Sequence, residues 1–246
     1  MIDLKRNLAV QAYCFRHFKV GGPVALARKV REIGLTKIEI SPPTDRALFK
    51  DTIQQYRDEG VDIASVFAPT LTGNEPAERS ACEFAKLCGL KHITVNFALN
   101  QNVYQTFALA EKLAAEYDLN LGIHNHGCSH WLGSAAMLDY VFQNTSPRIG
   151  LCLDTAWAQD ANLHAVDAVR KYANRLYGIH FKDFVYDRAK KHRDVVIGSG
   201  TIDLPAMIQA MRDIDYQGFA ALEYEGEPEN PNPALIACRE AIEKCC

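Results

Sequence analysis

The chain has 246 residues, of which 48% are hydrophobic, 23% charged and 9% aromatic, which excludes the disordered and fibrous classes. Its 27 Lys and Arg residues against 30 Asp and Glu residues give a formal charge of −3, so no basic surface for nucleic acid is expected. No apolar run reaches the ~18 residues that span a bilayer, and the first residues lack the apolar stretch of a signal peptide, so we expect a cytoplasmic protein without a membrane partner.

Short apolar runs alternate along the chain with longer segments of helical period. The predicted strands cover Leu8–Cys14, Lys37–Ile40, Asp62–Phe67, His92–Asn96, Leu119–Asn125, Ile149–Asp154, Leu176–Lys182 and Phe219–Tyr224. The predicted helices cover Val24–Ile33, Asp45–Glu59, Pro76–Leu87, Val103–Tyr117, Ser134–Phe142, Val166–Tyr172, Leu204–Ile214 and Pro233–Lys244. Gly34, Gly60 and Gly89 stand where the first three helices should end.

Eight strand-helix units in 246 residues give about 31 residues per unit, the size of one parallel strand with its crossover helix. The strands are short and apolar without clean alternation, as in a sheet covered on one face by helices and filled with core side chains on the other. The pattern predicts the α/β class and one (β/α)8 TIM barrel, with residues 1–246 in a single domain. A doubly wound open sheet is the alternative, but no GxGxxG motif follows the first strand.

Polar residues end the last four predicted strands, which is where a barrel of this kind carries its chemistry. The period of two along a strand places His124, Asp154, His180 and Glu223 on the inner face. Taken singly, such a histidine is usually a packing residue and such an aspartate a helix N-cap. Together, two imidazoles and two carboxylates would suit one divalent ion, Mn²⁺, Co²⁺, Zn²⁺ or Mg²⁺. The eight cysteines are scattered without a CxxC pair, so we expect reduced thiols and no closed zinc site.

Several segments resemble the signatures of a known family. The runs GIHNHG, LCLDTAW, GIHFKDF, GSGTIDL and LEYE look like those of the xylose-isomerase-like TIM-barrel superfamily, which includes ketose 3-epimerases, hydroxypyruvate isomerase, inosose dehydratase and endonuclease IV. The likeness follows the strand order over essentially the whole chain. It implies one divalent metal held by His124, Asp154, His180 and Glu223, and relatives that often form dimers or tetramers.

Two positions depart from the family pattern. The family's epimerases have a glutamate where this chain has His124, and a histidine that binds a metal has no lone pair left to act as a second base. Inosose dehydratase carries a similar histidine-rich fifth strand and an HxKD seventh strand. Trp157 stands where many relatives have a substrate-contacting histidine, so it either covers a face of the substrate or packs in the fold.

Further candidates surround the four ligands. Glu223 is expected to be ligand and general base together, with Glu225 as second choice and substrate contact. Lys182 lies two residues after His180 and should also point inward, where it could donate a proton to a leaving oxygen or neutralise the enediolate. The alternative for Lys182 is an ion pair with Asp183 or another acid at the rim. His126 could act as an acid or bind substrate hydroxyls.

Two other residues complete the predicted site. His130 belongs to the loop after strand five and is a candidate substrate contact. Glu39 ends the second strand, and we group it with the residues around the substrate or expect it to orient a ligand histidine. The alternative for Glu39 is a buried acid paired with a barrel lysine.

These features predict a metal-dependent enzyme that removes the α-proton of a keto-sugar or related polyol. The resulting enediolate can be reprotonated on the neighbouring carbon by an isomerase or on the other face by an epimerase. It can also lose a β-leaving group, as in a dehydratase acting on a 3-keto-sugar or inosose. Less favoured alternatives are an endonuclease IV-like phosphodiesterase, which would need about twice as many ligands, and a non-catalytic sugar-binding barrel.

The glycine-rich run Gly198-Ser199-Gly200 precedes a predicted helix and could cradle a phosphate. A plain turn with an N-cap is the favoured interpretation, and no cluster of Arg and Lys residues ends the strands. We therefore expect a sugar substrate without a phosphate group.

Overall fold

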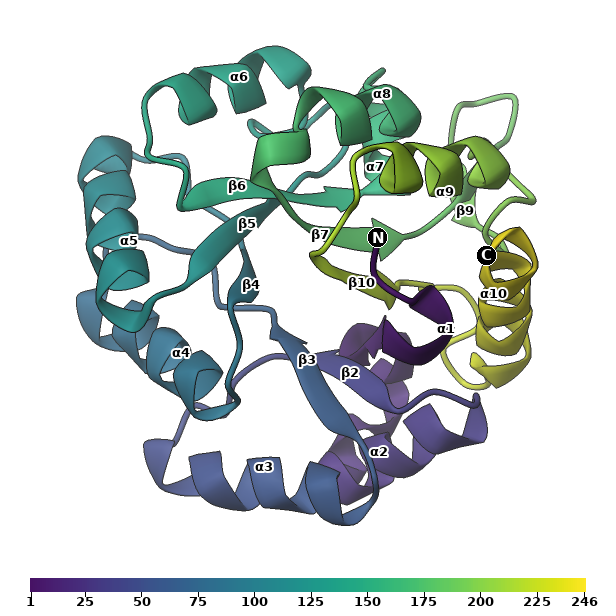
Figure 1. Ribbon diagram of the computed structural model, residues 1–246, viewed down its shortest axis with the longest axis horizontal. Helices are drawn as coiled ribbons and strands as arrows, with labels where there is room; N and C mark the ends of the chain where they lie inside the picture. Colours follow the sequence, from purple (N-terminus) through teal and green to yellow (C-terminus); the bar gives the residue numbers. More distant parts are fainter.

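The computed structural model describes residues 1–246 and confirms the predicted (β/α)8 barrel. Eight parallel strands form one sheet in the order β3-β2-β1-β10-β7-β6-β5-β4. These strands are β1 (Leu8–Gln11), β2 (Lys37–Ile40), β3 (Asp62–Val66), β4 (His92–Val95), β5 (Asn120–His124), β6 (Ile149–Asp154), β7 (Leu176–Phe181) and β10 (Phe219–Leu222). Figure 1 looks along the barrel and shows the helices surrounding the strands.

The main helices lie within a few residues of their predicted ranges. They are α2 (Gly22–Glu32), α3 (Phe49–Asp58), α4 (Glu75–Leu87), α5 (Val103–Tyr117), α6 (Ala135–Gln143), α8 (Ala165–Lys171), α9 (Leu204–Asp213) and α10 (Asn232–Cys245). Gly34, Gly60 and Gly89 follow α2, α3 and α4 with φ of 77°, 71° and 77°, values that favour glycine and end the helices as predicted. The short helices α1 (Leu4–Asn7) and α7 (Thr155–Asp160) and the 3-10 turn η3 (Ala173–Arg175) were not predicted. The first residues of the predicted helix Asp45–Glu59 form a separate 3-10 turn, η2 (Arg46–Leu48).

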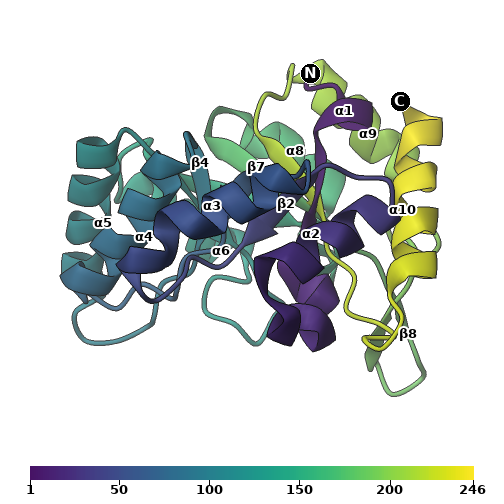
Figure 2. The same cartoon turned by 90° about the horizontal axis from the view of Figure 1, so that it is seen from below.

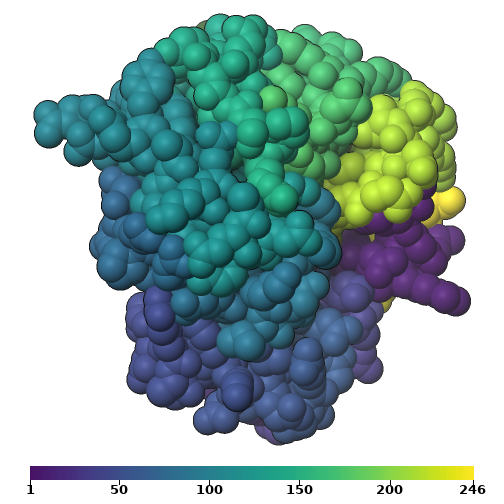
Figure 3. Space-filling model, turned by 60° about the vertical axis from the view of Figure 1, so that its left-hand side comes forward, coloured from purple at the N-terminus to yellow at the C-terminus, as the bar shows by residue number.

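The helices pack on the strands through one apolar core of 65 buried residues. Figure 3 shows the flank of α4 and α5, where the side chains of these segments form the outer surface in blue and teal. None of the helices is both long enough and apolar enough to cross a lipid bilayer. All eight cysteines are free thiols.

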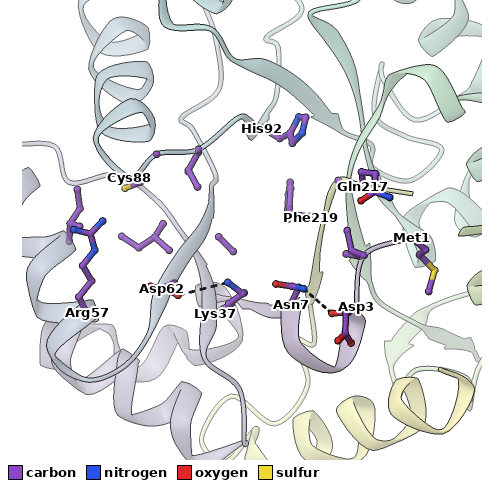
Figure 4. A pocket seen from close by; sticks show the side chains of 17 residues that line it. Met1, Asp3, Asn7, Lys37, Arg57, Asp62, Cys88, His92, Gln217 and Phe219 are labelled. Carbon is purple, nitrogen blue, oxygen red and sulfur yellow. Dashed lines mark hydrogen bonds and ion pairs between the residues drawn. The ribbon is translucent and has the colours of Figure 1, made fainter. Parts of the chain in front are cut away.

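The barrel closes between β3 and β4 only near their carboxyl ends. There, the amide of Ala68 donates to the carbonyl of Thr94 at 2.9 Å, and that of Leu71 to Asn96 at 2.7 Å. Toward their amino ends no ladder joins the two strands, and a cavity of about 680 Å³ opens between the starts of β2, β3, β4 and β10 (Figure 4). His92 lines this cavity, so it lies at the end of the barrel away from the predicted ligands.

The first predicted strand is wrong after Gln11. The side chain of Gln11 accepts a hydrogen bond from the amide of Tyr13, which turns the chain out of the sheet into the 3-10 segment η1 (Ala12–Gly21). Cys14 therefore belongs to η1. The hairpin of β8 (Phe184–Tyr186) and β9 (His192–Asp194) was also not predicted, and it projects from the end of the barrel opposite the two chain termini (Figure 2).

Asp183 fixes the connection that follows this hairpin. Its buried carboxylate accepts hydrogen bonds of 2.8 to 3.2 Å from the backbone amides of Phe184, Gly198, Gly200, Thr201 and Ile202. These amides are the ones that a phosphate would have needed, so the glycine-rich run is a plain turn, as favoured by the sequence. Asp203 then caps α9 by accepting from the amide of Ala206 at 3.0 Å.

We expect Asp183→Asn to lower the free energy of unfolding by about 3 kcal/mol, because the amide group loses the charge and turns a donor toward buried N–H groups. Urea denaturation followed by circular dichroism measures the change. Asp187→Asn is the matched control, since Asp187 is exposed and accepts from the amides of Ala189 and Lys191 in an ordinary turn. An equal loss of stability in both variants would show that the hydrogen bonds to Asp183 stabilise the fold no more than those of an exposed turn.

Candidate metal centre

The four predicted ligand residues meet at the carboxyl end of the barrel. His124 ends β5, Asp154 ends β6, His180 lies in β7, and Glu223 directly follows β10. One ligand atom from each residue lies within 4.8 Å of the others, and all four residues are buried. The parallel strands thus deliver two imidazoles and two carboxylates to one point.

The unpartnered atoms of this cluster fit a divalent cation. Nε2 of His124 lies 3.5 Å from Oδ2 of Asp154 and 3.5 Å from Oε2 of Glu223. Neighbouring ligands around one ion lie roughly 3 to 3.5 Å apart when each bond is about 2.1 Å long. Both ring nitrogens of His124 and Oδ2 of Asp154 are buried without a hydrogen-bond partner. A buried polar atom without a partner costs about 1–3 kcal/mol, and a cation bound here would replace the missing partners.

Glu39 lies behind His180. Nδ1 of His180 is 2.5 Å from Oε2 of Glu223, whereas Nε2 is 2.7 Å from Oε2 of Glu39. The other carboxylate oxygen of Glu39 accepts from the hydroxyl of Thr94. Glu39 is fully buried and does not line the cavity above the cluster, so it is positioned to orient His180 and not to touch a substrate.

Asp154 caps a helix and also faces the cluster, although from the sequence the N-cap and the metal ligand were alternatives. Its Oδ1 accepts from the amide of Trp157 at 2.8 Å and so caps α7, while Oδ2 faces the cluster. The side chain of Asn125 pairs with the backbone of Asp154 through hydrogen bonds of 2.9 and 3.1 Å. Asn125, which the sequence did not single out, therefore ties the ends of β5 and β6 together.

Lys182 lies beneath the cavity and is surrounded by carboxylates. Its ammonium is 3.3 Å from Oε1 of Glu223 and 3.8 Å from Oδ2 of Asp194, and it also contacts Glu225. Burial by itself would lower the pKa of Lys182, but these charges, Glu223 foremost, raise it. Burial would likewise raise the pKa of Glu223, and Lys182 and His180 instead hold it well below its usual range.

A cavity of about 370 Å³ opens above the cluster. It is lined by Gln11, Tyr13, Lys19, Ser41, Phe67, His124, His126, Trp157, Glu223 and Glu225. Five of these are new: Gln11, Ser41 and Phe67 end or follow β1, β2 and β3, and inspection of the early strand ends would have found them. Tyr13 and Lys19 lie in η1, for which the sequence carried no signal.

Three further predicted residues, His126, His130 and Trp157, lie at or near the cavity. Burial, His124 and His130 lower the pKa of His126 to about 4, and this ring lines the cavity. The ring of His130 packs 4.7 Å from that of His126, and His130 does not line the cavity. Trp157 lines the cavity and also packs edge-on against Phe184, with ring centres 4.9 Å apart.

Comparison with known proteins places this geometry in context. A family model described as xylose isomerase-like TIM barrel matches residues 27–245. An inosose dehydratase of Bacillus velezensis is 29% identical over 144 residues, which are 51% of this chain and 48% of that protein. The chain thus spans about half the length of the curated relatives it matches.

Two solved structures share the fold over nearly the whole chain. A 3-keto-D-glucoside 4-epimerase from E. coli superposes with a TM-score of 0.77 at 15% identity, covering 97% of this chain and 99% of that one. A probable 3-DHS dehydratase from Bacillus anthracis superposes with a TM-score of 0.75 at 16% identity, covering 96% and 98%. At these identities the likeness concerns the fold alone.

We expect Mn²⁺ or Co²⁺ to stabilise the chelator-treated protein. A cation present at 100 times its Kd contributes about 2.7 kcal/mol to a folded state that alone binds it. For a chain of this size that is a rise of roughly 5 to 10 °C in Tm, measured by scanning calorimetry. His124→Gln should abolish the rise, whereas His130→Gln should keep it. No shift in the wild type, or the same shift in both variants, would contradict a metal at this cluster.

Proposed function

The chain belongs to the xylose isomerase-like TIM barrel family, and from that premise we propose a divalent-metal-dependent enzyme that removes the α-proton of a keto-sugar or related polyol. The observation that carries the proposal is the convergence of His124, Asp154, His180 and Glu223 below a cavity of about 370 Å³. Two of the four, His124 and Glu223, line that cavity, so a small molecule in it would touch the cluster directly.

The position of each residue determines its proposed role in the reaction. A divalent ion held by the four side chains would polarise a substrate carbonyl and acidify the proton on the adjacent carbon. Glu223 is the carboxylate that both belongs to the cluster and faces the cavity, so it accepts that proton. Lys182, 3.3 Å from Glu223, keeps this carboxylate ionised before the transfer. Glu39 holds the ring of His180 in place from behind.

A dehydratase is the second candidate, and His124 favours it. An epimerase that works through two facing carboxylates needs a second one where this chain has an imidazole. Elimination needs one base and one acid, and the base can be Glu223. Glu223 can also pass that proton on to the departing hydroxyl, which leaves as water, and the neutral ring of His126, which also lines the cavity, is the candidate to hydrogen-bond that hydroxyl. The inosose dehydratases among the relatives agree with this alternative.

The test is exchange of the α-proton in D₂O, followed by NMR on a panel of keto-sugars, inososes and 3-keto-glycosides with Mn²⁺-loaded protein. We expect deuterium at a carbon next to the carbonyl. Glu223→Gln should slow this exchange by about 100-fold or more, the usual contribution of a general base. Bound metal is measured in the same samples, so that loss of the ion is distinguished from loss of the base.

Glu240→Gln on the exposed face of α10 serves as the matched control and should exchange like the wild type. Exchange by Glu223→Gln at the wild-type rate would transfer the base to another residue. Absence of exchange with every member of the panel, despite bound Mn²⁺, would reject the proposed chemistry.

Product analysis separates the two candidates, because a dehydratase releases one water and leaves an unsaturated ketone, whereas an isomerase or epimerase returns a sugar of unchanged mass. We expect His126→Ala to slow formation of an elimination product more than it slows α-exchange. Mass spectrometry and NMR of the same reactions measure both rates. Equal slowing of the two rates would argue against a contact between His126 and the departing hydroxyl.

A further inference from the structure

Lys19 contributes the one lysine side chain to the lining of the cavity above the cluster. It lies in η1, the 3-10 segment that follows β1, and it lines the cavity together with Tyr13. A lysine at the edge of a cavity can bind an anionic group of a ligand only if no protein acid already neutralises it. The partners of Lys19 therefore decide what it can do.

No carboxylate oxygen lies within 4.0 Å of the Lys19 ammonium, because the nearby acids have other partners. Glu223 and Glu225 pair with Lys182, and the carboxylate of Glu229 lies 2.5 Å from Nδ1 of His17. The cavity at the other end of the barrel differs in this respect, since its Lys37 lies 3.8 Å from Asp62 (Figure 4).

A second cation, Arg16, contacts the same tyrosine ring as Lys19 but does not itself line the cavity. The guanidinium of Arg16 and the ammonium of Lys19 lie 5.0 and 5.2 Å from the ring centre of Tyr13. Arg16 donates only to carbonyl oxygens, those of Tyr13 and Glu225. Burial and the charge of Arg16 lower the pKa of Lys19. Two cations without a carboxylate partner thus contact the ring of Tyr13, and Lys19 is the one of them that lines the cavity.

We propose that Lys19 determines substrate specificity by binding a carboxylate of the sugar substrate, so that the enzyme acts on a keto-sugar acid. This inference rests on the proposed function for the identity of the substrate as a sugar. The cavity, about 370 Å³, falls within the roughly 300–1,000 Å³ of small-molecule sites. One free ammonium matches the single charge of a carboxylate.

A phosphate is the less suitable anion for this site. Phosphate sites in barrels commonly use backbone amides at a helix N-terminus. Here the glycine-rich turn that could have supplied such amides is bound to the carboxylate of Asp183. An anion in this cavity would therefore be bound by Lys19 and not by backbone amides of the glycine-rich turn.

The test is calorimetric binding of three probes that differ in one terminal group, D-sorbitol, D-gluconate and D-sorbitol 6-phosphate. We expect the wild type to bind gluconate about fivefold more tightly than sorbitol, the upper range for one exposed charged contact. Lys19→Met should remove this preference and Lys19→Arg should retain most of it. The preference should also weaken as NaCl increases, because Lys19 is exposed to solvent.

The measurements are made with both Mn²⁺-loaded and metal-free protein, because a carboxylate could also bind the ion. A gluconate preference that survives Lys19→Met, or that exists only with metal, would overturn the role of Lys19. Tighter binding of sorbitol 6-phosphate than of gluconate would overturn the carboxylate assignment. Lys50→Met, an equal charge change on exposed α3, is the control and should bind all probes as the wild type does.

Failure of this inference is distinct from failure of the proposed function. The probes carry no carbonyl, so their binding does not depend on α-proton abstraction. Exchange of neutral keto-sugars in D₂O without any carboxylate preference would leave the enzyme proposal intact and reject the role of Lys19. A carboxylate preference that disappears in Lys19→Met, found without exchange of any keto-sugar, would support the role of Lys19 and reject the enzyme proposal.

Discussion

The structure depends on the closure of eight short parallel strands whose side chains alternate between the core and the helices. Because all eight strands run in the same direction, their last inward-facing residues meet at one end of the barrel. That constraint brings His124 and Glu223 to 3.5 Å although 99 residues separate them in the chain. It also places His92, which starts β4 instead of ending a strand, in the cavity at the opposite end.

Burial of so many ionisable groups is tolerated because each carboxylate has a partner. Glu39 contacts Thr94 and His180, Glu223 contacts Lys182 and His180, and Asp183 is surrounded by backbone amides. An unpaired buried charge would cost several kcal/mol. Both ring nitrogens of His124 and Oδ2 of Asp154 are among the buried atoms without a hydrogen-bond partner, and a cation bound at the cluster would supply one.

Much of the fold, the four residues of the cluster and five of the ten residues that line the cavity above it could be predicted from the sequence. The period of two placed His124, Asp154, His180 and Glu223 on the inner face, and the family resemblance, whose motif segments helped to fix the strand phases, implied the same four residues. The prediction did not extend to the end of β1, because the side chain of Gln11 caps η1 and overrides the β propensity of the residues after it. The sequence suggested Asp183 or another acid at the rim as the partner of Lys182. In the folded chain Lys182 pairs with Glu223, Glu225 and Asp194, because the carboxylate of Asp183 is occupied by backbone amides.

The sequence by itself determined the strand-helix repeat and the residue types at the strand ends, because these are encoded in periods of 2 and 3.6 residues. Tertiary structure alone decided which acids surround Lys182, that Glu39 stands behind His180, and that Lys19 faces the cavity without a counter-ion. Each of these depends on segments that meet only in the folded barrel, such as Arg16 and Glu225, which are 209 residues apart. Contacts at that separation are set by barrel closure and leave no local pattern in the chain.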